Sequence, residues 1–167
     1  MALFQNKYRD GTFRAAWWDY GQNAAYFVTM CTQNRIHFFG EIQNQKMILK
    51  PMGVVAEKCW HEIPQHFPFV KLGAFIVMPD HVHGIIIIDK PATEIRQSNK
   101  SPKNQFGPQS GNLASIVRGY KIGVTMISKN ICPEFKWQRL YHDRIIRNAD
   151  EYQRISRYIE NNPSQVD

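Results

Sequence analysis

Two histidines one residue apart, His81 and His83, are the first candidates for chemistry in this chain. They follow the Pro79-Asp80 break within the stretch FIVMPDHVHGIIIID. Side chains two residues apart on a strand project from the same face, so both imidazoles can bind one metal ion. The spacing is also compatible with two histidines at the mouth of a strand that share no task.

The residues around the pair favour a functional site. Gly84 and the run Ile85 to Ile88 predict a strand buried on both faces, and a rigid central strand is a suitable support for a site. Zinc would require a third His, Cys or carboxylate ligand, whereas magnesium or manganese accepts an amide or carboxylate oxygen. A third ligand must therefore come from another part of the chain.

Length and composition limit the class of protein. The chain has 167 residues, 43% of them hydrophobic, which predicts a single domain with its own core. Its three cysteines are far apart and form no C-x-x-C pair, which argues against a disulfide framework or a zinc ribbon. We find neither a signal peptide nor an apolar run of membrane-spanning length, and expect a cytoplasmic protein with no membrane contact. The net charge of +7 favours a polyanionic partner such as nucleic acid.

Hydrophobic periodicity predicts an α+β fold, an antiparallel sheet of the ferredoxin-like sandwich type with helices packed against it. We expect strands at 25–31, at 69–78 and at the histidine stretch, with a hairpin between the last two. Helices are expected from Met52 to Pro64, after Asn112, and from Asn148 to 161–163, with a short extended segment at 135–141. Residues 1–23 are interpreted as an arm and 90–110 as a mobile loop inserted in the single domain 1–167.

The expected third helix carries a tyrosine and an amide that complement the histidines. Tyr158 and Asn162 are four residues apart, so both side chains can rise from one helix face. A tyrosine can supply a nucleophilic oxygen, and an amide carbonyl can complete a metal site. From this helix alone, Tyr158 could equally be an amphipathic cover of the core and Asn162 a simple helix end.

The chain resembles the single-tyrosine HUH transposases of bacterial insertion sequences, and more closely the REP-associated tyrosine transposases. The resemblance covers most of the chain and rests on motifs in the family's order: Tyr26-Phe27-Val28-Thr29 with Arg35, Val77 to Gly84, Asn112-Leu113 with Arg118-Gly119, Trp137-Gln138, Ile146-Arg147-Asn148 and Tyr158 to Pro163. Two features depart from the family pattern. The 90–110 loop lengthens the spacing between the histidines and the tyrosine, and Tyr120 offers a second candidate nucleophile.

The resemblance implies a role for each candidate residue. His81 and His83 would bind a divalent metal ion, Mg²⁺ or Mn²⁺, and Asn162 stands where the family places an amide third ligand. Tyr158 would attack a DNA phosphate, which gives nicking and rejoining of single strands, as in DNA transposition, through a 5′-phosphotyrosine intermediate. The Tyr-x-x-x-amide pattern matches Tyr158 alone, whereas Tyr120 lies within an apolar helical stripe typical of a core residue.

The family resemblance also implies the partner, single-stranded or hairpin DNA, and leaves monomer and homodimer both open. Basic residues in the second half of the chain are the expected phosphate contacts: Arg118, Lys121, Arg139, Arg144, Arg147, Arg154 and Arg157. Their excess over acidic residues is modest, and a solvated surface would have a similar composition.

Three other functions compete with this interpretation. A histidine-triad-like nucleotide hydrolase would require a third histidine at position 85, which is Ile85. A non-catalytic RNA- or DNA-binding module could use Arg118-Gly119-Tyr120, but that RRM-like signature belongs on a strand and here lies in a helical stripe. A degenerate transposase that binds DNA without cutting stays open, and metal-dependent cleavage would distinguish it from an enzyme.

Overall fold

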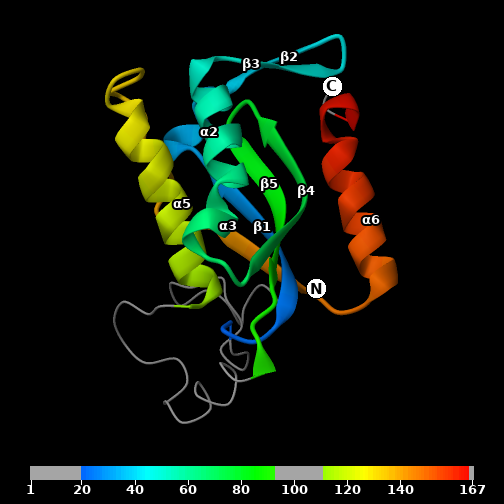
Figure 1. Ribbon diagram of the computed structural model, residues 1–167. Helices are drawn as coiled ribbons and strands as arrows, with labels where there is room; N and C mark the ends of the chain where they lie inside the picture. Colours follow the sequence, from blue (N-terminus) through cyan, green and yellow to red (C-terminus); the bar gives the residue numbers. More distant parts are fainter. Residues whose placement is uncertain (1–19, 93–110, 166–167) are drawn as a thin grey trace, which may run out of the picture.

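The structure, a computed structural model, describes residues 20–92 and 111–165. Its main sheet is antiparallel, with strand order β4-β5-β1-β6, and the strands are β1 (Ala24–Cys31), β4 (Val70–Met78), β5 (His81–Ile88) and β6 (His142–Ile146). With α2 (Pro51–His61) and α5 (Leu113–Ser128), the main elements follow the order β1-α2-β4-β5-α5-β6 (Figure 1). This is the ferredoxin-like βαββαβ arrangement, which confirms the predicted fold class.

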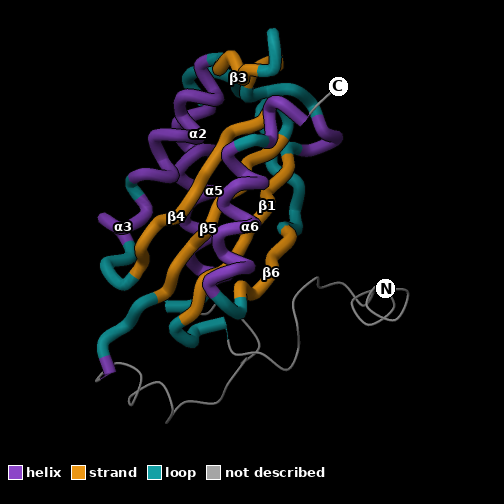
Figure 2. The backbone as a smooth tube through the Cα atoms, turned by 90° about the vertical axis from the view of Figure 1, so that its right-hand side faces the viewer, coloured by secondary structure: helices purple, strands orange, loops and turns teal. Residues whose placement is uncertain are grey.

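Helices cover both faces of the sheet. The short helix α3 (Ile63–His66) continues the line of α2, and both lie with α5 on one face. The last helix, α6 (Ala149–Glu160), lies alone on the opposite face, in front of the strands in Figure 2. Among the described residues, no helix is both long enough and apolar enough to cross a membrane.

The core lies between the sheet and the pair α2 and α5. Alternate residues of β1 (Tyr26, Val28 and Met30) point into it and are fully buried. Trp60 of α2 packs against Gly84 of β5, where an added Cβ would come within 2.3 Å of the indole ring. A glycine is therefore required at this position for the helix to approach the strand.

The hairpin that joins β4 to β5 is present where the sequence predicts it. Met78 pairs with His81, so the Pro79-Asp80 connection is a two-residue turn. On its other side β5 pairs with β1, with Cys31 opposite His81 and Thr29 opposite His83. The histidines therefore begin a central strand that has neighbours on both edges.

Several elements differ from the sequence-based expectation. β6 was not expected. It is an edge strand with several exposed polar residues, so its sequence lacks the apolar pattern of a buried strand. The 135–141 segment, expected to be extended, contributes only an isolated bridge between Trp137 and Thr32. A second hairpin, β2 (Gly40–Gln43) and β3 (Lys46–Leu49), was also not expected; it turns at Asn44 and Gln45, which have φ of 51° and 61°.

Two predicted segments fall largely outside the described residues. The 1–23 arm is described only from Tyr20, which is buried against Tyr26, and the 90–110 loop only for its first three residues. The predicted helix from Met52 to Pro64 divides into α2, which ends at His61, and α3, which contains Pro64. The third helix begins as predicted, because the Asn148 side chain accepts a hydrogen bond of 2.8 Å from the Glu151 backbone N–H.

Candidate active site

The two histidine side chains lie next to each other at the start of β5. Their ring centroids are 4.4 Å apart, as expected for side chains on one strand face. His83 is 7% exposed, and the His81 side chain is 14% exposed. Both imidazoles are thus largely removed from water but reachable from the face that α6 covers.

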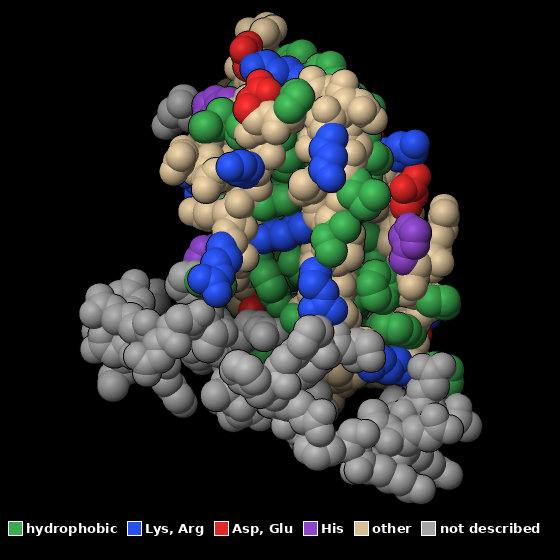
Figure 3. Space-filling view, turned by 90° about the vertical axis from the view of Figure 1, so that its left-hand side faces the viewer, with side chains coloured by type: hydrophobic (Ala, Val, Ile, Leu, Met, Phe, Trp, Pro, Cys, Tyr) green, Lys and Arg blue, Asp and Glu red, His purple; other side chains and the backbone are tan. Residues whose placement is uncertain are grey.

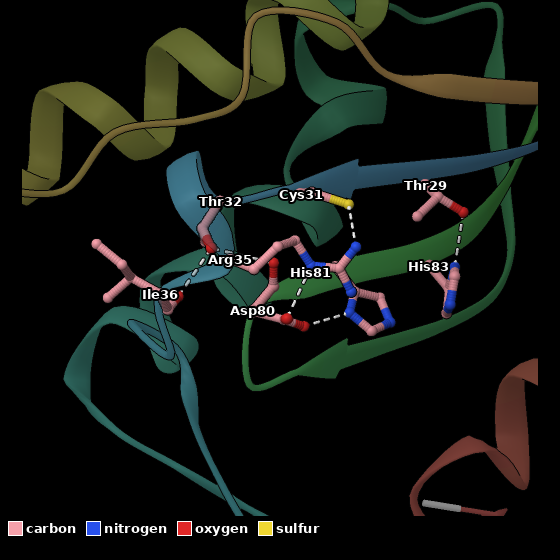
Figure 4. A network of polar contacts seen from close by, with 8 residues as sticks. All are labelled: Thr29, Cys31, Thr32, Arg35, Ile36, Asp80, His81 and His83. Atoms are coloured by element: carbon pink, nitrogen blue, oxygen red, sulfur yellow. Dashed lines mark hydrogen bonds and ion pairs between the residues drawn. The ribbon is translucent and has the colours of Figure 1, made fainter.

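Each imidazole is held by a hydrogen bond at Nδ1. His81 Nδ1 lies 2.6 Å from Oδ1 of Asp80, and His83 Nδ1 lies 2.8 Å from Oγ1 of Thr29 on β1 (Figure 4). A ring whose Nδ1 is occupied in this way has Nε2 available for a metal ion, and its orientation is fixed. The two rings therefore have the chemistry expected of metal ligands.

The site also favours the neutral imidazoles that metal binding requires. Burial, followed by the neighbouring His81 and Arg35, lowers the pKa of His83 to about 3, against a smaller opposing effect of Asp80. Burial likewise lowers the pKa of His81, although the Asp80 carboxylate opposes this shift. Both rings are therefore uncharged at neutral pH, with a lone pair available for a ligand.

Tyr158 lies next to the histidine pair and belongs to α6, the helix that packs on this face of the sheet. Its ring centroid lies 5.8 Å from that of His83 and 6.2 Å from that of Phe27, which it meets edge to face. Tyr158 is 45% exposed, which leaves part of the residue open to solvent. The structure thus brings together His81, His83 and Tyr158 from two elements that are distant in sequence.

The other candidate nucleophile, Tyr120, lies in the core. Its hydroxyl donates a hydrogen bond of 2.9 Å to the backbone carbonyl of Ala56, and burial raises its pKa well above the usual value. Its ring packs against Trp60 and Trp137 on the α5 side of the sheet. Tyr120 is therefore separated by the sheet from the histidine pair.

Asn162 is not part of the helix that carries Tyr158. It is the first residue of the 3₁₀ turn η2 (Asn162–Gln165) and is 7% exposed, so the expected shared helix face does not apply. Within 20–92 and 111–165, no hydrogen bond joins the Asn162 side chain to either imidazole. The same residues contain no group of three or more His, Cys, Asp or Glu able to hold a metal ion. A third protein ligand would therefore have to be of another type, such as an amide.

The basic residues expected to contact DNA are distributed over both sides of the sheet. Those with exposed side chains are Arg118, Arg139, Arg144, Arg147, Arg154 and Arg157, of which Arg144 pairs with Glu151 at 2.8 Å. Figure 3 shows Lys and Arg side chains spread over the face that α5 covers, with apolar and neutral polar groups between them. Lys121 is partly exposed, and its Nζ donates to the carbonyls of Gln138 and Leu140 at 2.9 and 3.5 Å.

Three residues near the histidines were not assigned a role from the sequence. Thr29 and Asp80 hold the two rings, and Phe27 contacts both His83 and Tyr158. Asp80 is adjacent to His81 in sequence and could have been suspected as a hydrogen-bond partner. Thr29 and Phe27 lie more than fifty residues from the histidines, and only the pairing of β1 with β5 brings them there.

The chain is similar to known proteins in sequence and in fold. An uncharacterized protein of Haemophilus influenzae is 38% identical over 157 residues, which cover 91% of this chain and 87% of that protein. No family model matches the sequence. Among solved structures, a REP-associated tyrosine transposase bound to a REP hairpin superposes with a TM-score of 0.57 and 17% identity, over 90% of this chain and 73% of the other.

A second solved structure, a candidate transposase from Deinococcus radiodurans R1, superposes with a TM-score of 0.50 and 14% identity, over 89% of this chain and 95% of that one. At such low identity these likenesses describe the fold alone. The identity to the Haemophilus protein, by contrast, extends over nearly the full length of both chains. The chain therefore belongs to the same family as the Haemophilus influenzae protein, and its fold is that of the tyrosine transposases.

Proposed function

We propose that this protein cuts and rejoins single-stranded DNA through a covalent link to Tyr158, with a divalent metal ion held by His81 and His83. The observation that carries the proposal is the position of the accessible Tyr158 ring, 5.8 Å from a histidine pair whose Nδ1 atoms are both hydrogen-bonded. A structural tyrosine would not need two oriented neutral imidazoles beside it. The likeness of the fold to that of a REP-associated tyrosine transposase supports the proposal.

The residues present fit a divalent ion such as Mg²⁺ or Mn²⁺. His81 and His83 would supply two nitrogens, and Asn162, buried at the end of α6, is the proposed source of an amide oxygen. A metal ion held there would polarise the scissile phosphate and stabilise the charge on the departing 3′ oxygen. Water ligands would complete the coordination, as is usual for Mg²⁺.

The chain's own residues account for the covalent step. The Tyr158 oxygen bonds to phosphorus as the bond from phosphorus to the 3′ oxygen breaks, and the 3′ oxygen ends as a hydroxyl. The proton of Tyr158 can pass to water, because this side chain is 45% exposed. The products are a 5′-phosphotyrosine and a free 3′ hydroxyl. An incoming 3′ hydroxyl can reverse the step, because the phosphotyrosine link retains the energy of the phosphodiester.

The proposed substrate is single-stranded or hairpin DNA. The transposase of the same fold is bound to a REP hairpin, and this chain carries a net charge of +7. Two exposed basic residues, Arg154 and Arg157, belong to the helix that bears Tyr158. They would contact phosphates on either side of the reacting one.

A covalent adduct is the measurement that tests this function. Labelled single-stranded DNA from the sequences flanking the gene is incubated with the protein, with and without Mn²⁺, and resolved under denaturing conditions. We expect an adduct with the parent protein and with Tyr152→Phe, a control on the same helix, and none with Tyr158→Phe. DNA binding without an adduct in the parent protein would favour a degenerate transposase that binds DNA without cutting it. An adduct mapped to the peptide that contains Tyr120 would show that Tyr120, and not Tyr158, is the nucleophile.

A further inference from the structure

The turn that precedes the histidines is fixed by two other segments of the chain. The Asp80 carbonyl accepts hydrogen bonds from the backbone N–H of Thr32, at 2.9 Å, and from its hydroxyl, at 3.2 Å. The neighbouring Pro79 carbonyl accepts a bond of 3.0 Å from the N–H of Phe39. Thr32 is completely buried, so these bonds are protected from water. The backbone of Asp80 is therefore held independently of its side chain.

The Asp80 carboxylate is held as firmly as its backbone. Its Oδ2 accepts from Nε of Arg35 at 2.8 Å, while its Oδ1 faces Nδ1 of His81 at 2.6 Å (Figure 4). Burial alone would raise the pKa of this carboxyl, but the hydrogen bonds from Arg35 and His81 outweigh burial and lower it. Asp80 is thus an anion at neutral pH, with one oxygen committed to each neighbour.

Arg35 reaches this carboxylate from an unusual backbone conformation. Arg35 and the preceding Asn34 have φ of 56° and 57°, in the left-handed region that non-glycine residues seldom occupy. The hydroxyl of Thr32 also bonds to the Ile36 carbonyl at 2.7 Å and so closes this turn. Strain of this kind persists where the surrounding contacts determine the conformation, and it is common near functional sites.

We infer that Asp80, clamped by Arg35, is a positioning residue that fixes the tautomer and the ring orientation of His81. A neutral imidazole carries one N–H, and a carboxylate at Nδ1 accepts it there, so the lone pair is confined to Nε2. Thr29 orients the His83 ring through a hydroxyl, which can donate or accept and so does not by itself select a tautomer. Because metal binding at His81 is part of the proposed function, this role of Asp80 rests on that proposal.

The tautomer of His81 is measurable without metal or DNA. ¹⁵N chemical shifts of the histidine rings, recorded at neutral pH, distinguish Nδ1–H from Nε2–H. We expect His81 as the Nδ1–H form in the parent protein and in Asp80→Asn, whose amide oxygen can still accept the bond. In Asp80→Ala we expect a shift toward the Nε2–H form that prevails in water. An Nε2–H tautomer in the parent protein, or no change in Asp80→Ala, would overturn the inference.

The second readout is Mn²⁺ affinity, measured by the loss of the free-ion electron paramagnetic resonance signal. We expect Asp80→Ala to weaken binding roughly 10- to 100-fold, and Asp80→Asn to weaken it less. Asp89→Ala is the matched control: Asp89 follows the other end of β5, pairs with Lys71 at 2.7 Å, and should leave the affinity unchanged. Equal affinity in Asp80→Ala and the parent protein would contradict the positioning role.

These measurements separate the two proposals. If the parent protein binds one Mn²⁺ and His81→Ala abolishes binding while Asp80→Ala does not affect it, the metal site stands and the role of Asp80 fails. If the parent protein binds no Mn²⁺, the proposed function fails, and so does the role of Asp80 in positioning His81 as a metal ligand. The ¹⁵N shifts would then still show whether Asp80 sets the His81 tautomer.

Discussion

The two faces of the sheet differ in what they contain. Toward α2 and α5, β1 presents the fully buried Tyr26, Val28 and Met30, which join a large apolar core. Toward α6, the same strand presents Phe27 and Thr29. Among the described residues, the apolar cluster on this side has four buried members, which are Ile85, Ile146, Ile155 and Ile159. Alternate side chains of β1 therefore contribute to the core on one side of the sheet and to the proposed site on the other. Substitutions on the α6 face should therefore affect catalysis, and those on the other face should affect folding.

Removal of the histidine pair should have the largest effect. We expect the double variant His81→Ala, His83→Ala to lose all metal-dependent cleavage, because it removes both nitrogen ligands of the proposed metal site. His61→Ala, on the exposed side of α2, should cut DNA like the parent protein. Cleavage of labelled DNA in Mn²⁺ and circular dichroism are the measurements. A double variant that cuts normally would place the site elsewhere.

A smaller loss of activity is expected at Phe27, which touches both His83 and Tyr158. Phe27→Leu should retain the fold and the DNA affinity but slow single-turnover cleavage roughly 10- to 100-fold, because the Tyr158 ring loses its edge-to-face partner and its alignment. If Phe27→Leu instead lowered the free energy of unfolding and left the cleavage rate unchanged, the proposed difference between the two faces would not hold.

Tyr120 provides the opposite test, on the α5 face. Tyr120→Phe removes the buried hydrogen bond to the Ala56 carbonyl, so it should reduce the free energy of unfolding by about 1–3 kcal/mol. Urea denaturation measures this change, and the covalent DNA adduct should form as in the parent protein. If a folded Tyr120→Phe protein formed no adduct, a residue on the α5 face would affect the proposed reaction, contrary to the expected difference between the two faces.

The smallest effect should come from Lys121, whose pKa burial lowers to about 8. Between pH 8 and the usual lysine value of 10.5, the unfolded state binds more protons than the folded state, so this group makes stability rise with pH. Lys121→Met should remove that rise. Urea denaturation of both proteins at pH 7.5 and 9.5 gives the comparison, and an identical pH dependence would show that Lys121 does not contribute.

The sequence by itself determined the elements whose residues carry a local signal. The alternation in β1, the stripe of α5, the cap at Asn148 and the short turn before His81 all depend on neighbours within a few residues, and each is confirmed. The shared orientation of the His81 and His83 side chains also follows from local geometry, because a strand places alternate side chains on one face. The sequence closes the helix of Tyr158 at 161–163, and the helix ends at Glu160, so Asn162 lies just beyond it in η2 and not on the expected shared helix face.

Only the tertiary structure decided which distant residues meet. The approach of Tyr158 to His83, and the burial of Tyr120 behind the sheet, depend on which face each helix covers. β6 was hidden because an edge strand half exposed to water has no apolar run. Thr29, Arg35 and Asp80 act on the histidines through the pairing of β1 with β5 and a strained turn, and neither leaves a periodic signal in the sequence. The physical reason is that chain segments far apart in sequence come together through burial and hydrogen bonding over the whole domain.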